Sequence, residues 1–342
     1  MIGQNISHYQ ITYKTRSPLM KTNLMLLLMA LLTIGLTSCG DGPRLDAQIV
    51  FESERDAPAP AIRFGGHGRT EIYVMDENGS NQRRLTYTVG DDRRSTLPHW
   101  SPDRLKIAFS TGPYRHMEMH IMDRDGSNVR RIWKAEGTQS EAWGPQWSPD
   151  GRRLAFVSNS GGNNDIYVMD SAGSNVSRLT LTEGSDKGSE DPTWSPDGER
   201  IAFNSNRDGI WEIYVMRSDG SDLQQLTYTL GESPGAGKPA WSPDGKSILF
   251  PSMRSSNSAN WYDAVDIYVI DADGSDLQRL THSGDNGSPV WSPDGKRIAF
   301  SSHRSGDSEI WWDNREIYLM KADGSNVQRL TFNKTWDSHP QW

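Results

Sequence analysis

One unit of roughly 50 residues recurs along the chain from residue 48 onward, and this repetition constrains the fold more than any other feature. The copies share, in order, a motif close to Pro-x-Trp-Ser-Pro-Asp-Gly, a short apolar run, a segment like Glu-Ile-Tyr-Val-Met-Asp, and an ending close to Arg-Leu-Thr. These pieces are rich in β-branched and aromatic residues and are bounded by Gly, Pro, Asp or Asn, which predicts four short strands per copy. No segment after residue 40 shows sustained helical periodicity.

The third piece of the unit shows how many copies there are. It begins at six places: Glu71, Glu118, Asp165, Glu212, Asp266 and Glu316. Four strands repeated six times indicate a six-bladed β-propeller over residues 48–342, all-β, with four antiparallel strands per blade. A ring is favoured over an open array because an array would leave sheet edges exposed at both ends.

The two ends of the repeat region are complementary. The first copy begins at Gln48 with its second strand, and the last copy stops at Trp342 within its Pro-x-Trp motif. We therefore expect His339 to Trp342 to insert as the innermost strand of the blade that Gln48 begins, and so to close the ring.

The stretches WSPDGKRIAFSS and REIYLMKADGSNVQRLT, within residues 291–331, resemble the TolB-like propeller repeat, a WD40-like family. The resemblance implies a six-bladed propeller of the kind found in TolB and in the propeller domains of some peptidases and lyases. It does not imply one activity. TolB-like proteins with an α/β domain before the propeller differ from this chain, where only Gly40 to Ala47 are expected to form a short linker.

The first 39 residues are typical of a secretory signal. Lys21 precedes an apolar run from Leu24 to Leu36, which is short for a membrane-spanning helix, the alternative interpretation. The Leu-Thr-Ser-Cys sequence that ends at Cys39 resembles a bacterial lipobox, which implies cleavage before Cys39 and its acylation. We therefore expect a lipid-anchored protein of the bacterial cell envelope, periplasmic or surface-exposed, which contacts the membrane only through its lipid. Met20 is an alternative start to Met1.

Spacing within the repeat separates two ends of each blade. The motif Trp is always seven residues before the next strand, and the third and fourth strands always begin thirteen residues apart. The spacing from the second to the third strand varies from 12 to 23 residues, and the spacing from the fourth strand to the next motif Trp varies from 11 to 15 residues. These two connections lie at the same end of a blade. We call these ends the fixed-turn face and the variable-loop face, and we expect the variable-loop face to bind a partner.

Aromatic residues of the varied connections support that expectation, since aromatic side chains are favoured anchors in interfaces. The predicted partner-binding residues are Trp211, Trp261, Tyr262, Trp311, Trp312 and Trp336. The alternative is that some of these rings pack between blades.

The sequence favours binding over catalysis. Its single cysteine is the expected lipid site, which leaves no Cys-His pair for nucleophilic catalysis. The net charge of −8 argues against nucleic acid as a partner. We expect no cofactor, but His99, His339 and Asp191 form a candidate metal site at the channel mouth, because we expect both histidines at the start of innermost strands. The alternative is that histidine is common in polar loops.

Two functions follow. The first is a non-enzymatic, monomeric envelope lipoprotein whose propeller binds an envelope protein through the variable-loop face. The alternative is a carbohydrate-binding protein or a metal-dependent, polysaccharide lyase-like enzyme.

One motif turn departs from the pattern, because Arg104 stands where the other copies have Gly. If the turn is kept, Arg104 adopts positive φ at a cost of about 1 kcal/mol, and Arg104→Gly is expected to stabilise the domain.

Overall fold

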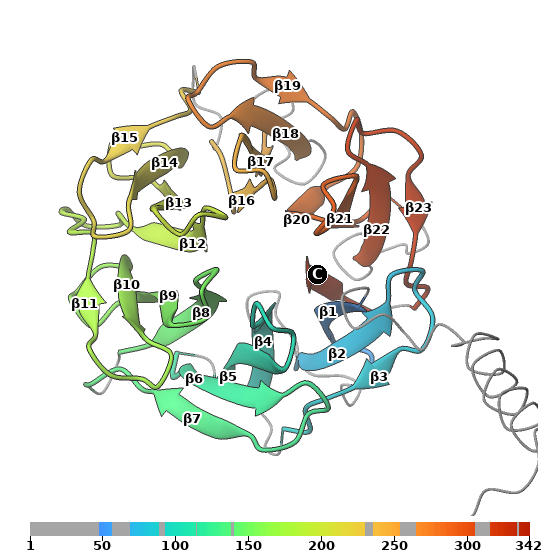
Figure 1. The fold of residues 1–342 in the computed structure, drawn as a ribbon, viewed down its shortest axis with the longest axis horizontal. Helices are drawn as coiled ribbons and strands as arrows, with labels where there is room; N and C mark the ends of the chain where they lie inside the picture. The colour runs from blue at the N-terminus through green and yellow to red at the C-terminus, as the bar shows by residue number, and fades with distance from the viewer. Residues whose placement is uncertain are drawn as a thin grey trace, which may run out of the picture. The chain divides into compact units, whose positions relative to one another are not determined.

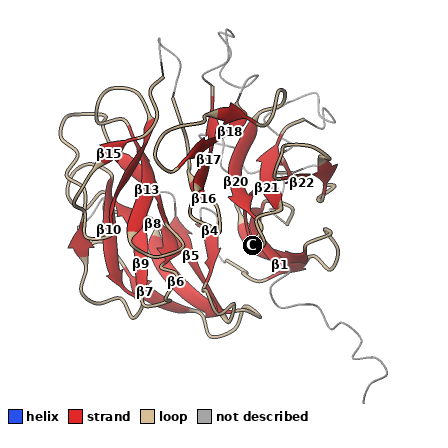
Figure 2. Ribbon diagram, turned by 45° about the horizontal axis from the view of Figure 1, so that its top comes forward, coloured by secondary structure: helices blue, strands red, loops and turns tan. Residues whose placement is uncertain are grey.

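A computed structural model describes residues 48–56, 69–88, 93–113, 115–137, 140–229, 235–253, 265–304, 315–333 and 335–342. Within these ranges, every regular element is a strand, and the strands form six four-stranded antiparallel sheets. Figure 1 shows the sheets as blades arranged in a ring, and Figure 2 shows the same strands in a view turned about the horizontal axis. No helix in the described part of the chain is long and apolar enough to cross a membrane.

The first three blades are built as follows, each from the innermost strand outward. Blade 1 contains β24 (Asp337–Gln341), β1 (Gln48–Ser53), β2 (Glu71–Asp76) and β3 (Arg83–Arg84). Blade 2 contains β4 (Arg93–Trp100), β5 (Lys106–Pro113), β6 (Glu118–Asp123) and β7 (Arg130–Trp133). Blade 3 contains β8 (Ala142–Trp147), β9 (Arg153–Ser158), β10 (Asp165–Asp170) and β11 (Ser177–Arg178).

The other three blades repeat this order. Blade 4 contains β12 (Ser189–Trp194), β13 (Arg200–Ser205), β14 (Glu212–Arg217) and β15 (Gln224–Gln225). Blade 5 contains β16 (Ala240–Trp241), β17 (Ser247–Ser252), β18 (Asp266–Asp271) and β19 (Gln278–Arg279). Blade 6 contains β20 (Asn286–Trp291), β21 (Arg297–Ser302), β22 (Glu316–Lys321) and β23 (Gln328–Arg329). The predicted fold class is confirmed.

The ring closes through the C-terminal strand, as predicted. β24 pairs antiparallel with β1, with Glu52 opposite Ser338 and Ser53 opposite Asp337. In Figure 1 the C-terminus lies beside β1. Trp342 is buried in a cluster that joins blade 1 to blade 6, so hydrogen bonds and apolar packing hold together the two ends of the repeat region.

A buried carboxylate explains why the third strand starts with Glu or Asp and the fourth ends in Arg-Leu-Thr. In blade 6, Glu316 accepts hydrogen bonds from Thr331 Oγ1 and from Arg329 Nη2, the latter at 2.9 Å. The Ile317 amide in turn donates to Thr331 Oγ1 at 3.0 Å. Blades 1, 3 and 5 repeat this arrangement, so the buried carboxylate has hydrogen-bond donors in each of these blades.

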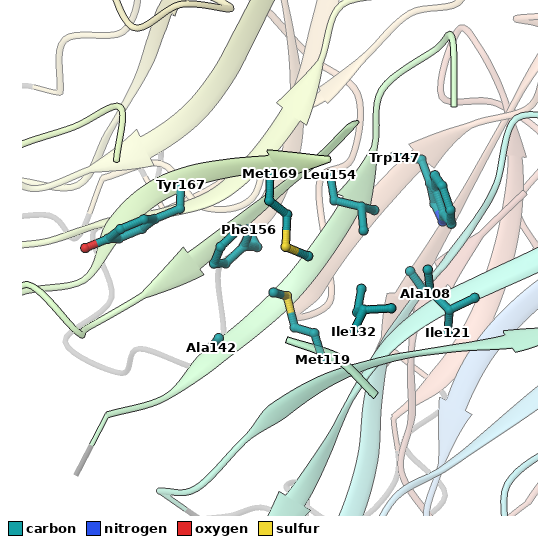
Figure 3. Close-up of a cluster of buried hydrophobic side chains, with 10 residues drawn as sticks. All are labelled: Ala108, Met119, Ile121, Ile132, Ala142, Trp147, Leu154, Phe156, Tyr167 and Met169. Carbon is teal, nitrogen blue, oxygen red and sulfur yellow. The ribbon is translucent and has the colours of Figure 1, made fainter. Parts of the chain in front are cut away.

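Apolar side chains fill the spaces between neighbouring blades. Figure 3 shows one such cluster, in which Trp147 of blade 3 lies against Ala108 and Ile121 of blade 2. The motif Trp therefore packs between blades. The phenylalanine of each second strand is fully buried in all six blades, namely Phe51, Phe109, Phe156, Phe203, Phe250 and Phe300.

Arg104 adopts positive φ (61°), as predicted, where the four motif glycines have φ of 69–72°. Its side chain, however, has a role that the sequence did not reveal. The guanidinium lies 5.0 Å from the ring centroid of Trp100 and donates to the carbonyl of Gln48 at 3.3 Å. For Trp194, Trp241 and Trp342, the covering guanidinium comes instead from the first residue of the preceding blade's second strand. Gln48 occupies that position before Trp100, so Arg104 supplies the missing cation.

The gain in stability expected for Arg104→Gly is therefore offset by the loss of this contact. Relief of positive φ gains about 1 kcal/mol, and loss of the cation–π contact costs about 0.5–1 kcal/mol, so the melting temperature should hardly change. The double variant Gln48→Arg/Arg104→Gly should be more stable than wild type by about 1 kcal/mol, because both features are then present. Thermal unfolding of the three proteins checks this; equal stability of the single and double variants would contradict it.

Candidate functional site

Five of the six innermost strands have a β-bulge at the residue before the motif proline. This residue has positive φ in five of the six blades, at Leu97, Gly144, Asp191, Ser288 and His339 (48–65°). The pairing register shifts at the same place, and the following proline, which has no N–H, sits where no ladder hydrogen bond is required. Bulges re-aim side chains, and three of these residues line a single cavity at the channel.

That cavity has a volume of about 580 Å³ and lies at the variable-loop end of the channel. Blades 1 to 4 all contribute to it, through residues at the starts of innermost strands and the ends of second strands. We call it the loop-face cavity. Its charged lining residues are Glu52, Arg94, Arg115, Glu141, Glu190, Asp191 and His339.

Glu52 and His339 link the closure strand to the cavity wall. His339 Nδ1 lies 2.8 Å from Glu52 Oε1, and Ser338 Oγ donates to the same oxygen at 2.8 Å. From blade 2, the Leu97 amide donates to Glu52 Oε2 at 3.0 Å and Thr96 Oγ1 donates to it as well. Burial opposes ionisation of Glu52, but the His339 charge and these hydrogen bonds outweigh it and hold the pKa of Glu52 well below 4.5.

Glu190 and Asp191 form an acidic pair on the blade 4 side. Burial, together with the neighbouring Asp191 charge, raises the pKa of Glu190 to about 7, although Asn164 Nδ2 donates to Glu190 Oε1 at 2.6 Å. Glu190 therefore changes charge near neutral pH. A cationic group placed beside the pair would favour its ionised form.

Glu141 faces the two arginines on the other side of the cavity. Burial raises the pKa of Glu141 despite the nearby positive charges of Arg94 and Arg115. The cavity thus has cations towards blade 2 and carboxylates towards blade 4, and Trp143 adds an aromatic surface. Such a lining can bind polar or charged groups of a partner and orient them.

The candidate metal residues are only partly brought together. Asp191 and His339 line the loop-face cavity, whereas His99 does not. The expectation that both histidines start innermost strands is wrong. His339 is the third residue of β24, and His99 is the second-last residue of β4 and lies towards the fixed turns. Among the described residues, no group of three or more His, Cys, Asp or Glu side chains is arranged to hold a metal ion.

Two of the predicted partner-binding residues lie in the described ranges, and both make internal contacts. Trp336 lies edge-on to His303, with ring centroids 5.2 Å apart, and Arg315 lies 5.0 Å from the centroid of Trp336. Trp211 is half-buried, and its carbonyl accepts a hydrogen bond from the Ala236 amide at 2.6 Å. Trp261, Tyr262, Trp311 and Trp312 lie outside the described residues, as does Cys39, so their roles remain predictions.

Exposed apolar residues occur at both ends of the fourth strands. On the variable-loop face they follow the Arg-Leu-Thr sequence or its equivalent: Tyr87, Leu181, Tyr228 and Phe332 are 67–74 % exposed. On the fixed-turn face they are aliphatic and less exposed, as with Leu223 at 42 %. The variable-loop face therefore presents larger apolar side chains around its rim.

Sequence reasoning missed Glu52 and Glu190, although the aligned copies contain a signal for both. Glu52 is the only charged residue at the fifth position of the second strands, and Glu190 is the only charged residue two places before a motif proline. A charge at a position that is otherwise uncharged, next to the channel, indicates a role specific to that blade.

Comparisons with known proteins agree with the architecture. The profile of a family described as TolB beta propeller domain matches residues 98–261 and 232–342. Comparison with curated proteins gives no match. Among solved structures, TolB from Acinetobacter baumannii is 20 % identical with a TM-score of 0.67, and the alignment covers 96 % of this chain and 74 % of that one.

Two further structures show the range of proteins with this fold. A putative TolB from Agrobacterium tumefaciens is 25 % identical with a TM-score of 0.58, covering 75 % of this chain and 84 % of that one. An oligogalacturonate lyase in complex with manganese is 14 % identical with a TM-score of 0.53, covering 84 % and 74 %. The repeat, the six blades and the profile match together show that the chain belongs to the TolB beta-propeller domain family.

Proposed function

We propose that this chain is a non-enzymatic lipoprotein of the bacterial envelope whose propeller binds a protein partner at the variable-loop face. The observation that supports this most is the loop-face cavity, a charged depression of about 580 Å³ to which four blades contribute. Concave sites with a few converging polar groups are the usual binding sites of proteins. Exposed aromatic residues around the rim supply apolar contact area. Cys39 would tether the propeller to a membrane.

The test is affinity capture from solubilised envelopes with two matched double variants. Glu190→Gln/Asp191→Asn removes two carboxylates from the cavity, and Asn tolerates the positive φ of Asp191 (51°). Glu199→Gln/Asp222→Asn removes two carboxylates from the fixed-turn face, where Asp222 also has positive φ (56°). We expect at least a tenfold loss of the captured partner for the cavity variant only. Equal recovery by all three proteins would show that the cavity is not the site.

The predicted aromatic residues are tested in the same experiment. Replacing Trp261, Trp311 and Trp312 by Ala should reduce capture if they contact the partner, since buried aromatic anchors typically contribute 2 kcal/mol or more each. Unchanged capture by this variant would remove these residues from the proposed interface and leave the cavity as the candidate.

A carbohydrate-active role is the second candidate. Trp143, Arg94 and Arg115 line one cavity, and this combination of a ring with two cations suits an acidic sugar. Incubation with acidic polysaccharides and a divalent metal ion distinguishes the two functions. Product double bonds that absorb in the ultraviolet would establish lyase action and overturn the non-enzymatic proposal.

A further inference from the structure

A second cavity, of about 230 Å³, lies at the opposite end of the channel. Its walls are mainly motif residues, including the rings of Trp194, Trp241, Trp291 and Trp342. It reaches solvent between exposed turn prolines, such as Pro196 of blade 4. We call it the turn-face cavity.

The ionisable residues that line this cavity are His99 and Lys238, both of which are basic, and no carboxylate is among its described lining residues. Lys238 is half-buried and makes no hydrogen bond or ion pair within the described ranges. Burial lowers the pKa of Lys238, although Asp191 and Glu52 counteract this from the loop-face side. A half-buried ammonium without a hydrogen-bonded counter-charge gains most from an anionic ligand.

His99 offers a second donor to the same space. The Trp147 amide donates to His99 Nδ1 at 3.4 Å, so Nδ1 is the unprotonated nitrogen and the proton resides on Nε2. Burial, with the positive charges of Lys238 and Arg104, outweighs a backbone hydrogen bond at Trp100 and lowers the pKa of His99 to about 3, so the ring is neutral at physiological pH. The imidazole thus provides a neutral N–H donor beside the ammonium.

We propose that the turn-face cavity binds a small organic carboxylate with an apolar body, held between Lys238 and His99. The ammonium and the imidazole N–H would take the carboxylate oxygens, and the tryptophan rings would contact the apolar body. The apolar walls favour such a ligand over inorganic phosphate, whose larger charge needs more donors than these two.

The test uses benzoate and benzamide, which have the same shape but differ in charge, with the full chain and isothermal titration calorimetry. We expect benzoate to bind at least tenfold more tightly than benzamide. Lys238→Met should abolish that difference while keeping most of the side-chain volume. Lys246→Met is the control, because it removes an exposed lysine from the fixed turn of the same blade.

Equal binding of benzoate and benzamide, no binding of either, or unchanged benzoate binding by Lys238→Met would overturn the proposal. Tighter binding of phosphate than of benzoate would also do so. A measurement on the wild-type protein guards against a misfolded variant: benzoate should shift the imidazole nitrogen resonances of His99, and benzamide should leave them unchanged.

Discussion

Deletion of residues 339–342 is expected to lower the melting temperature by at least about 10 °C, or to abolish cooperative folding. The deletion removes most of β24 and exposes the edge of β1. It also removes Trp342, which is 9 % exposed and packs against blades 1 and 6. Loss of a buried Trp alone typically costs about 3–5 kcal/mol. Calorimetry or circular dichroism on heating measures the effect.

A permuted chain provides the matched control for this deletion. Residues 335–342 are moved in front of Gln48 and joined to it by Ser-Pro-Asp-Gly-Lys, the five-residue connection that blades 5 and 6 already use. Because β24 closes the ring through strand pairing and apolar packing, the permuted protein should recover most of the lost stability. Phe332→Ala, at a residue that is 74 % exposed, should change little. A truncated protein with the melting temperature of wild type would contradict the stabilising role of residues 339–342 in ring closure.

Glu52→Ala is expected to destabilise the domain by about 3–5 kcal/mol, because it leaves several hydrogen-bond donors around a buried carboxylate without their acceptor. Glu52 is 4 % exposed and joins Ser338 and His339 of β24 to Thr96 and Leu97 of blade 2. Glu52→Gln should cost less, because the amide oxygen still accepts hydrogen bonds. Urea unfolding at pH 7.5 measures both effects.

The same residue predicts an acid dependence of stability. Because folding lowers the pKa of Glu52 from 4.5, its contribution is complete above that pH and is lost as pH falls towards the folded-state pKa. The wild type should therefore lose stability below about pH 4.5 more steeply than Glu52→Gln, which cannot titrate there. Glu199→Gln, at an exposed position, serves as the control and should follow wild type. Parallel acid profiles for wild type and Glu52→Gln would refute this role.

The strands were predictable from the sequence because each is specified locally. Every third strand begins at the acidic residue expected, and the ring closes through the strand that the broken motif indicated. Turn chemistry at Pro-Asp-Gly and short runs of β-branched and aromatic residues decide these elements without distant contacts. Even the positive φ of Arg104 followed from the position of glycine in the other copies.

The candidate site was less predictable because it depends on distant contacts. Glu52 and His339 are 287 residues apart in the sequence and meet only after closure. The bulge before the motif proline aims Asp191 into the loop-face cavity, and no periodicity reveals a bulge. His99 also depends on the exact strand position. It lies two residues after Leu97 in β4, and it lines the turn-face cavity, whereas Leu97 lines the loop-face cavity. Trp336 also contacts His303 and Arg315, which residue type alone did not indicate.

Binding of a protein partner at the variable-loop face can be tested by crosslinking from two positions of one blade. Tyr228 and Leu223 flank the two-residue strand β15, so they lie at opposite faces, and they are 70 % and 42 % exposed. A photoreactive phenylalanine derivative would replace each in turn, in the full chain within its native envelope. We expect a discrete protein adduct from position 228 and none from position 223. The same adduct from position 223, or an adduct from position 223 alone, would contradict it.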